Sequence, residues 1–206
     1  MFASWGPGME GTQTIEVWEP NRQLRLIDQR ERTFGSGGDA AATPVRLVVD
    51  YFLESKDGKT VLRLVHSGFG PGPDWDGEYE GTRSGWAGFF RTLKHGLERH
   101  PRKSTHNVTL FHVAPPGDAD ALWNQFFAAV PWQGREISRG ENPRTYQGTV
   151  AGLDDAMLSV AFSGQAAGQF IYVNLLLYGL PPERIAAVEQ EWKAALAQLP
   201  SAAPKE

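Results

Sequence analysis

The sequence contains no cysteine, which excludes disulfide bonds, thiolate metal ligands, cysteine nucleophiles and iron–sulfur ligation. This agrees with a reducing compartment, and we expect a cytoplasmic protein. Positive charge is not in excess, since 20 Lys and Arg face 24 Asp and Glu, so no basic surface is expected to neutralise a nucleic-acid backbone. No apolar run approaches the roughly 18 residues that span a bilayer, and the first residues lead us to expect no secretory signal. We therefore expect neither a nucleic-acid partner nor a membrane span.

What remains is the composition of an ordinary folded chain. Its 206 residues are 41% hydrophobic and 21% charged, values typical of soluble domains. This length gives room for one large domain or two small ones.

Alternating apolar residues predict two β-hairpins in the first half. Residues 14–19 and 23–28 alternate on either side of a turn that contains Pro20. Residues 45–53 and 60–66 alternate again and are joined through Asp57-Gly58, a strong hairpin signal.

A long helix is predicted from about Asp76 to Arg99, where Pro101 ends it. Its aromatic residues fall on one stripe at helical spacing, and most of its glycines lie off that stripe. Gly81, Gly85, Gly88 and Gly96 each cost the helix roughly 1 kcal/mol relative to alanine. The helix must therefore be held by burial of its aromatic stripe.

The second half repeats the order of strands followed by a long helix. We predict strands at 105–113, 146–153, 156–162 and 169–178, and a short helix at 119–129 with Asp118 as its N-cap. A final helix is opened by Pro181-Pro182-Glu183. The pattern predicts an α+β chain of two tandem modules, residues 1–103 and 104–206.

The first half also resembles a known family. The strand ending in His66-Ser67-Gly68-Phe69 and the helix with Gly85-Trp86 are similar to the C-terminal signature of domains like the activator of the 90-kDa heat-shock-protein ATPase, in the START-like (SRPBCC) superfamily. The quoted residues are Arg63 to Gly70, Trp75-Asp76, Tyr79 to Trp86 and Phe89 to Lys94. The resemblance covers about residues 5–100, and residues 104–206 share only a similar order of elements.

The resemblance implies a helix-grip fold, in which a curved antiparallel sheet wraps around a long C-terminal helix and leaves an apolar cavity. Family domains begin with a strand and one or two short helices, which are missing before the first hairpin here. Three explanations stay open: the start is internal, the first module is truncated, or residues 105–129 supply the missing piece.

An apolar cavity in the first module would be lined by aromatic residues and one histidine. The candidate ligand-binding residues are Tyr51, His66, Phe69, Tyr79, Trp86 and Phe90. Aromatic residues at helical spacing are core packing unless the sheet curves away from them, and a histidine satisfied by Ser67 or a backbone carbonyl is the simpler reading of His66. We expect His95 and His100, at the helix end, to be cationic or solvated. No metal-ligand spacing occurs, so we predict no metal, no cofactor and no catalytic residue.

Three functions follow from these observations. The leading one is non-catalytic binding of a small apolar ligand in a START-like cavity, to which the resemblance adds a stress-related role. An enzyme of the superfamily's cyclase or hydrolase type would need at least two converging polar groups, and the sequence offers His66 with little else. A co-chaperone-like interaction with a chaperone partner is suggested by the resemblance but not supported by the residues.

Overall fold

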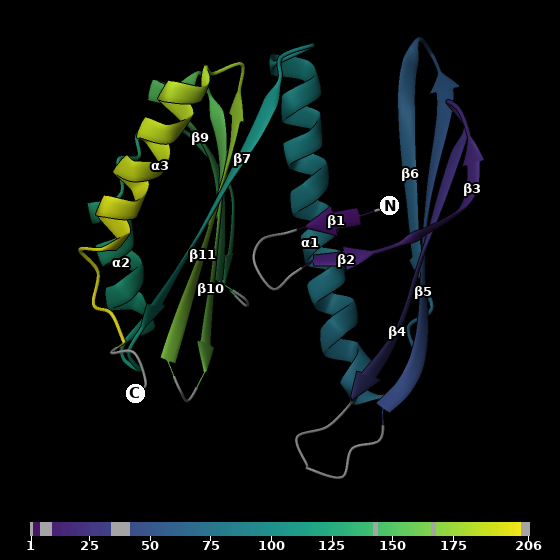
Figure 1. Cartoon of the computed structure of the whole chain (residues 1–206), viewed down its shortest axis with the longest axis horizontal. Helices are drawn as coiled ribbons and strands as arrows, with labels where there is room; N and C mark the ends of the chain where they lie inside the picture. Colours follow the sequence, from purple (N-terminus) through teal and green to yellow (C-terminus); the bar gives the residue numbers. More distant parts are fainter. Residues whose placement is uncertain (1, 5–9, 34–41, 142–143, 166–167, 203–206) are drawn as a thin grey trace. The chain divides into compact units, whose positions relative to one another are not determined.

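The computed structural model of the chain describes residues 2–4, 10–33, 42–141, 144–165 and 168–202. The chain divides into two compact units, Met1–Gly85 and Trp86–Glu206. In the described part the fold is mixed α+β, with one four-stranded sheet, one five-stranded sheet, a small two-stranded sheet and three α-helices (Figure 1). None of these helices is long and apolar enough to cross a membrane.

The first unit contains an antiparallel meander in the order β3-β4-β5-β6. Its strands are β3 (Thr14–Glu19), β4 (Gln23–Thr33), β5 (Ala42–Lys56) and β6 (Lys59–Ser67). Both predicted hairpins are confirmed, and Asp57 and Gly58 have φ of 51° and 71°, as a tight hairpin turn requires. A separate pair, β1 (Phe2–Ser4) with β2 (Glu10–Thr12), was not predicted.

A glycine fixes the passage from this sheet to the first helix. Gly68 has φ of +100°, and a Cβ there would lie 2.2 Å from the carbonyl oxygen of Arg46. Only glycine fits such a close approach of two backbones. The chain then enters α1 (Pro73–Arg99), which confirms the predicted long helix.

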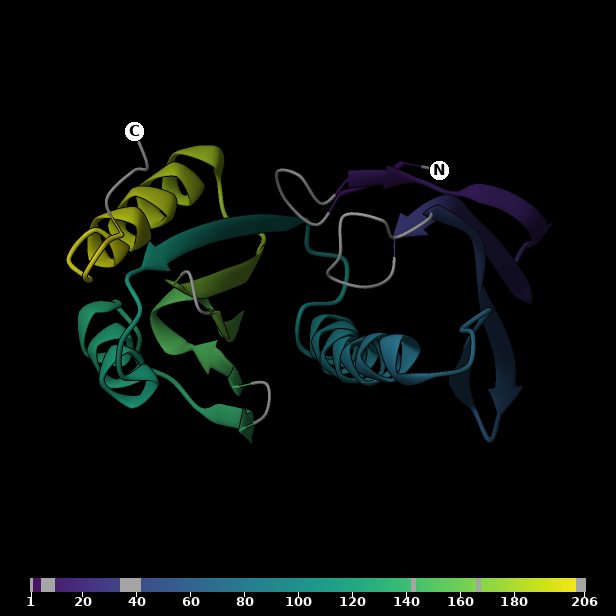
Figure 2. The same ribbon diagram turned by 90° about the horizontal axis from the view of Figure 1, so that it is seen from below.

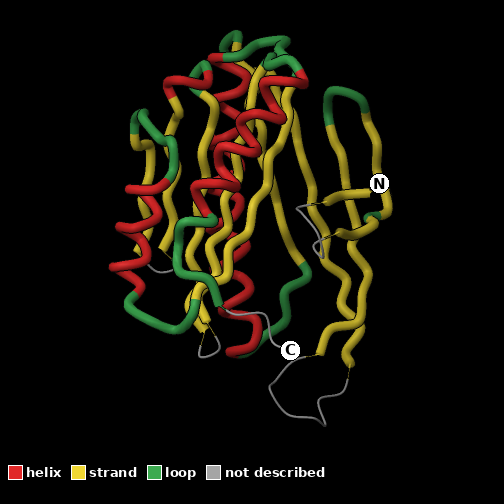
Figure 3. The backbone as a smooth tube through the Cα atoms, turned by 60° about the vertical axis from the view of Figure 1, so that its left-hand side comes forward, coloured by secondary structure: helices red, strands yellow, loops and turns green. Residues whose placement is uncertain are grey.

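The second unit has a five-stranded antiparallel sheet in the order β7-β11-β10-β9-β8. The elements are β7 (Thr105–Ala114), α2 (Ala119–Ala129), β8 (Glu136–Glu141), β9 (Arg144–Val150), the 3-10 turn η1 (Ala151–Leu153), β10 (Ala156–Gln165), β11 (Gly168–Tyr178) and α3 (Pro182–Leu196). Figure 3 traces these strands along the backbone.

Strand β7 settles one of the explanations left open by the sequence. It pairs with β11 from Ala114 opposite Gln169 to Thr105 opposite Tyr178. Residues 105–129 therefore complete the sheet of the second unit and do not supply a strand to the first sheet.

Helices α2 and α3 cover the same face of this sheet (Figures 1 and 2). Alternate residues of β11 point to them, so Ile171, Val173 and Leu175 are fully buried. The helices contribute Phe126 and Trp192 to the same core. Asp118 caps α2 by accepting a hydrogen bond from the backbone N–H of Asp120 at 2.8 Å, as predicted.

The second half of α1, from Trp86 onward, packs on the opposite face. Gln147 lies between core-facing neighbours on β9, so its side chain points away from α2 and α3. It donates to the carbonyl oxygen of Gly88 at 3.1 Å and accepts from the Arg91 Nε at 2.6 Å. A Cβ at Gly96 would lie 3.3 Å from the Tyr178 ring. Two glycines off the aromatic stripe therefore allow this half of the helix to approach the sheet closely.

Candidate functional site

The predicted ligand-binding residues form two aromatic groups. In the first unit the Phe69 ring lies 4.9 Å from His66 and 5.6 Å from Tyr79 between ring centroids. In the second unit Trp86 lies 6.3 Å from Phe90 along α1. The sequence thus identified neighbours within each group.

Tyr51 shares the first group's side of the sheet. It pairs across the hairpin with Leu64, two positions before His66, so Tyr51 and His66 point to the same face. Burial raises the pKa of the Tyr51 hydroxyl above its usual value.

The rings of the first group contact one another. Phe69 also meets Trp75 edge-on at 5.9 Å, so its ring has aromatic neighbours on three sides. Two recesses among the described residues are lined by other residues than these six. One of these recesses, about 490 Å³, lies on β4 and β5 and is lined by Gln29, Glu31, Pro44, Val45 and Arg46.

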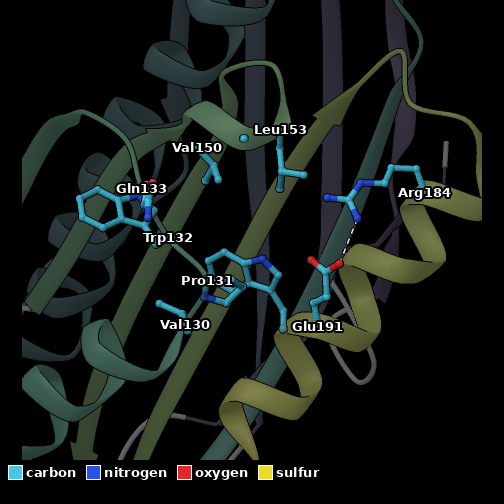
Figure 4. A pocket seen from close by; sticks show the side chains of 10 residues that line it. Val130, Pro131, Trp132, Gln133, Val150, Leu153, Arg184 and Glu191 are labelled. Carbon is cyan, nitrogen blue, oxygen red and sulfur yellow. Dashed lines mark hydrogen bonds and ion pairs between the residues drawn. The ribbon is translucent and has the colours of Figure 1, made fainter.

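The other recess, which we call the α3 recess, lies in the second unit and has a volume of about 360 Å³ (Figure 4). It opens between α3, the η1 turn and the segment that follows α2. Its lining residues are Val130, Pro131, Trp132, Gln133, Val150, Gly152, Leu153, Arg184, Glu191 and Trp192. Most of this wall is apolar.

Backbone hydrogen bonds hold the wall in place. The N–H of Ala151 donates to the carbonyl oxygen of Gln133 at 2.8 Å, and the N–H of Thr149 donates to that of Arg135 at 2.9 Å. A Cβ at Gly134 would lie only 1.6 Å from the Thr149 oxygen. The segment after α2 can therefore lie against the end of β9 only because a glycine stands there.

Aromatic packing holds the Trp132 side chain. Its ring lies 5.5 Å from Tyr146 and 5.8 Å from Phe127, both in edge-to-face geometry. Burial is also the main reason why the pKa of the Tyr146 hydroxyl rises to about 12. The Trp132 indole therefore forms a rigid part of the wall, supported by the core behind it.

The charged side of the recess is an ion pair on α3. Arg184 Nη1 lies 3.0 Å from Glu191 Oε1, and both side chains are about half exposed. Figure 4 shows this pair on α3, with Leu153 nearby and Trp132 at the other side of the recess. The recess thus combines apolar walls with one charge of each sign.

Few polar side chains line the α3 recess. Among its lining residues the polar side chains are Arg184 and Glu191, which neutralise each other, the amide of Gln133, and the indole N–H groups. Within the described residues no group of three His, Asp or Glu side chains is placed to hold a metal ion.

A buried histidine cluster lies elsewhere in the second unit, and here a sequence expectation is wrong. His100 is not solvated but only 5% exposed, and it stacks on Tyr178 with ring centroids 4.0 Å apart. Burial, followed by repulsion from His95, lowers the pKa of His100, although Asp154 opposes the shift. His95 Nε2 lies 2.8 Å from the carbonyl oxygen of Asp155 and donates a hydrogen bond to it in the tautomer that carries the proton on Nε2.

Comparison with known proteins adds little to this description. No family model matches the chain, and no curated protein matches it. Among solved structures, the crystal structure of DynU16, a protein in the dynemicin biosynthetic locus, is 18% identical, with 90% of this chain and 77% of that chain covered at a TM-score of 0.30. A likeness at this level carries no argument about function, so the START-like resemblance stays a prediction.

Proposed function

We propose that this protein binds a small, mostly apolar molecule in the α3 recess and performs no chemistry on it. The observation that carries the proposal is a recess of about 360 Å³ whose apolar wall includes Trp132, Trp192 and Leu153. Sites for small molecules are typically concave, about 300–1,000 Å³ in volume and lined mainly by apolar and aromatic side chains. The α3 recess meets each of these conditions.

The ion pair indicates what kind of molecule fits. An apolar body would lie against Trp132 and Leu153, while a polar end would remain near Arg184 and Glu191. An anionic end of the ligand could replace Glu191 as the partner of the Arg184 guanidinium. This end would stay in contact with water, because the Arg184 side chain is half exposed. An amphipathic ligand therefore suits the recess better than a hydrocarbon.

The expected affinity is modest. Each Å² of apolar surface removed from water contributes about 25 cal/mol, and the lost translational and rotational freedom of the ligand opposes this gain by at least about 4 kcal/mol. The recess exposes little apolar surface, because Val150, Leu153 and Trp192 are only 2%, 6% and 1% exposed. Binding experiments should therefore extend to millimolar ligand.

The sequence-based alternatives have less support. An enzyme needs at least two converging polar groups that are not already satisfied by each other, and the charged pair in the recess is matched. The aromatic group of His66, Phe69 and Tyr79 remains a second candidate binding region in the first unit. Two helix-grip modules also remain a proposal, supported by two four-strand meanders that are each followed in the sequence by a helix.

Titration with 8-anilinonaphthalene-1-sulfonate tests the proposal, since this probe joins an apolar ring system to an anionic group. Gly152 lines the recess and has open space at its Cβ position, so Gly152→Phe should fill the recess. We expect saturable fluorescence with the unmodified chain and at least ten-fold weaker binding to Gly152→Phe.

The matched control is Gly77→Phe, because Gly77 lies on α1 and also has open space at its Cβ position. This variant should bind the probe as the unmodified chain does. Equal binding of the probe by all three proteins would contradict the proposal. So would a protein that binds no small molecule but has a co-chaperone activity, if Gly152→Phe leaves that activity unchanged.

A further inference from the structure

Buried polar atoms without partners gather at the end of α1. His100 is 5% exposed, and neither of its ring nitrogens has a hydrogen-bond partner among the described residues. The hydroxyl of Tyr178, on which His100 stacks with an interplanar angle of 9°, has no such partner either. A buried imidazole without hydrogen bonds costs stability. Phenylalanine would keep the stack without that cost, so packing alone does not explain a histidine here.

Charged groups lie close to this histidine. They are His95 and Arg99 on α1, Lys103 in the segment that follows, Asp154 and Asp155 in the turn before β10, and Tyr178 on β11. Asp154 Oδ2 lies 3.8 Å from His100 Nδ1 but is already paired with Lys103. An imidazolium at this place would therefore have to share its carboxylate with a cation.

The same residues attach the segment 100–104 to the sheet of the second unit. The N–H of Gly179, just after β11, donates to the carbonyl oxygen of Ser104 at 2.8 Å. A Cβ at Gly179 would lie 3.1 Å from Cδ of Lys103, so the lysine stem runs close to this glycine. The stack of His100 on Tyr178 is the apolar part of the attachment.

We propose that His100 is a proton-sensitive switch. Uptake of a proton by its imidazole releases residues 100–104 and the last turn of α1 from the end of β11, while the sheet of the second unit stays folded. A buried site without hydrogen-bond partners disfavours the charged imidazole, and release returns it to water. The proposal does not depend on ligand binding in the α3 recess.

The direction of the pH dependence follows from this burial. Burial, followed by the nearby His95, lowers the pKa of His100 in the attached form, whereas a solvated imidazole has a pKa near 6.5. Acid therefore favours the released form. Between pH 7.5 and pH 5 the released form gains up to about 30-fold in relative population, as long as attached His100 stays neutral.

His95 acts in the same direction. Its Nε2 lies 2.8 Å from the carbonyl oxygen of Asp155, and a protonated His95 keeps this hydrogen bond because both of its nitrogens then donate. Its ring centroid is 5.3 Å from that of His100. The added positive charge therefore repels a proton on attached His100 further.

Amide hydrogen exchange of the full chain, followed by nuclear magnetic resonance at pH 7.5 and pH 5, tests the proposal. The amides of Gly179 and Lys103 report on the attachment, since both donate backbone hydrogen bonds there. Val173, which is fully buried in the middle of β11, reports on the sheet. We expect the protection factors of the first two amides to fall by up to about 30-fold in acid and to stay well below that of Val173 at both pH values.

Two histidine variants separate the switch from other titrations. His100→Phe keeps a ring on Tyr178 but takes up no proton, so protection of Gly179 should be the same at both pH values. The matched control is His106→Gln, which removes an exposed histidine of β7 and should leave the acid response unchanged.

A second pair of variants tests the electrostatics even if His100→Phe fails to fold. Lys103→Gln and Asp154→Asn remove the same ion pair but leave opposite charges beside His100. The carboxylate left by Lys103→Gln stabilises an imidazolium in place, so the loss of Gly179 protection in acid should be smaller than in the unmodified chain. The lysine left by Asp154→Asn should keep this loss at least as large.

Three results overturn the proposal. The first is protection of Gly179 and Lys103 that does not change between the two pH values, or that is lost together with that of Val173. The second is an equal acid response of Lys103→Gln and Asp154→Asn. The third is a His100 ring that titrates near pH 6.5 while Gly179 keeps its protection.

Discussion

We expect the hydrogen bonds of Gln147 to stabilise the packing of the second half of α1 on the sheet of the second unit. The side chain is 8% exposed. Its amide N–H group donates to Gly88 O at 3.1 Å and lies 3.3 Å from Thr92 Oγ1 and 3.1 Å from Ser159 Oγ. Its oxygen accepts from Arg91 Nε at 2.6 Å. Gln147→Leu keeps the approximate volume of the side chain and removes all of these bonds.

The expected cost follows from the number of partners. An amide has two N–H donors and one oxygen; each neutral hydrogen bond contributes about 1 kcal/mol and the bond to the charged Arg91 about 2 kcal/mol. Arg91 is exposed and regains water, which leaves a loss of roughly 2–3 kcal/mol. At about 4 °C per kcal/mol for a unit of this size, the melting temperature should fall by about 8–12 °C.

Urea denaturation and hydrogen exchange measure the effect. The free energy of unfolding should fall by the amount above, and amide protection in residues 88–99 should decrease first. Gln29→Leu, on the exposed part of β4, is the control and should change stability by less than about 0.5 kcal/mol. The reasoning is refuted if Gln147→Leu is as stable as the control and residues 88–99 keep their protection.

Two further predictions concern the glycines of α1 and the histidine that follows this helix. Gly81→Ala, where a Cβ meets nothing within 4 Å, should raise stability by about 0.5–1 kcal/mol through helix propensity. Gly96→Ala should give no such gain, because its Cβ would lie 3.3 Å from the buried Tyr178 ring; equal gains in thermal melts would contradict the close approach. Stability should also fall as the pH drops below about 6.5, since unfolded His100 takes up a proton that the folded state resists. His100→Phe should flatten this pH dependence, and an unchanged slope in denaturation between pH 7.5 and 5 would count against the buried histidine.

Much of the secondary structure could be predicted because its signals are local. Asp57-Gly58 fixes a hairpin turn within a few residues, and Asp118 marks the start of α2 by its own side chain. Strand β8 was missed because Glu136–Glu141 carries one large apolar residue, Ile137, among charged and small ones. Its place in the sheet comes from pairing with β9, which no local pattern reveals.

The candidate site could not be predicted in the same way. The lining of the α3 recess joins Trp132, Leu153 and Arg184, which lie on three segments that no spacing rule connects. The aromatic stripe of α1 was visible, but the role of Gly88 and Gly96 depends on which sheet residues they meet. The eight-residue separation of these glycines, with Thr92 between them, was the one signal that could have indicated a close-packed second face. The burial of His100 could not be predicted either, because His100 stacks on Tyr178, which lies far along the chain.

The most direct test of ligand binding is a titration followed by nuclear magnetic resonance, with 8-anilinonaphthalene-1-sulfonate as the ligand. Trp132 lines the α3 recess, whereas Trp18 on β3 is 65% exposed and lies in the first unit. The account predicts saturable shifts of the Trp132 indole N–H and of the Leu153 methyl groups, with the Trp18 indole unchanged. Shifts confined to Trp18 and the first unit, or no saturable shift at Trp132, would contradict it.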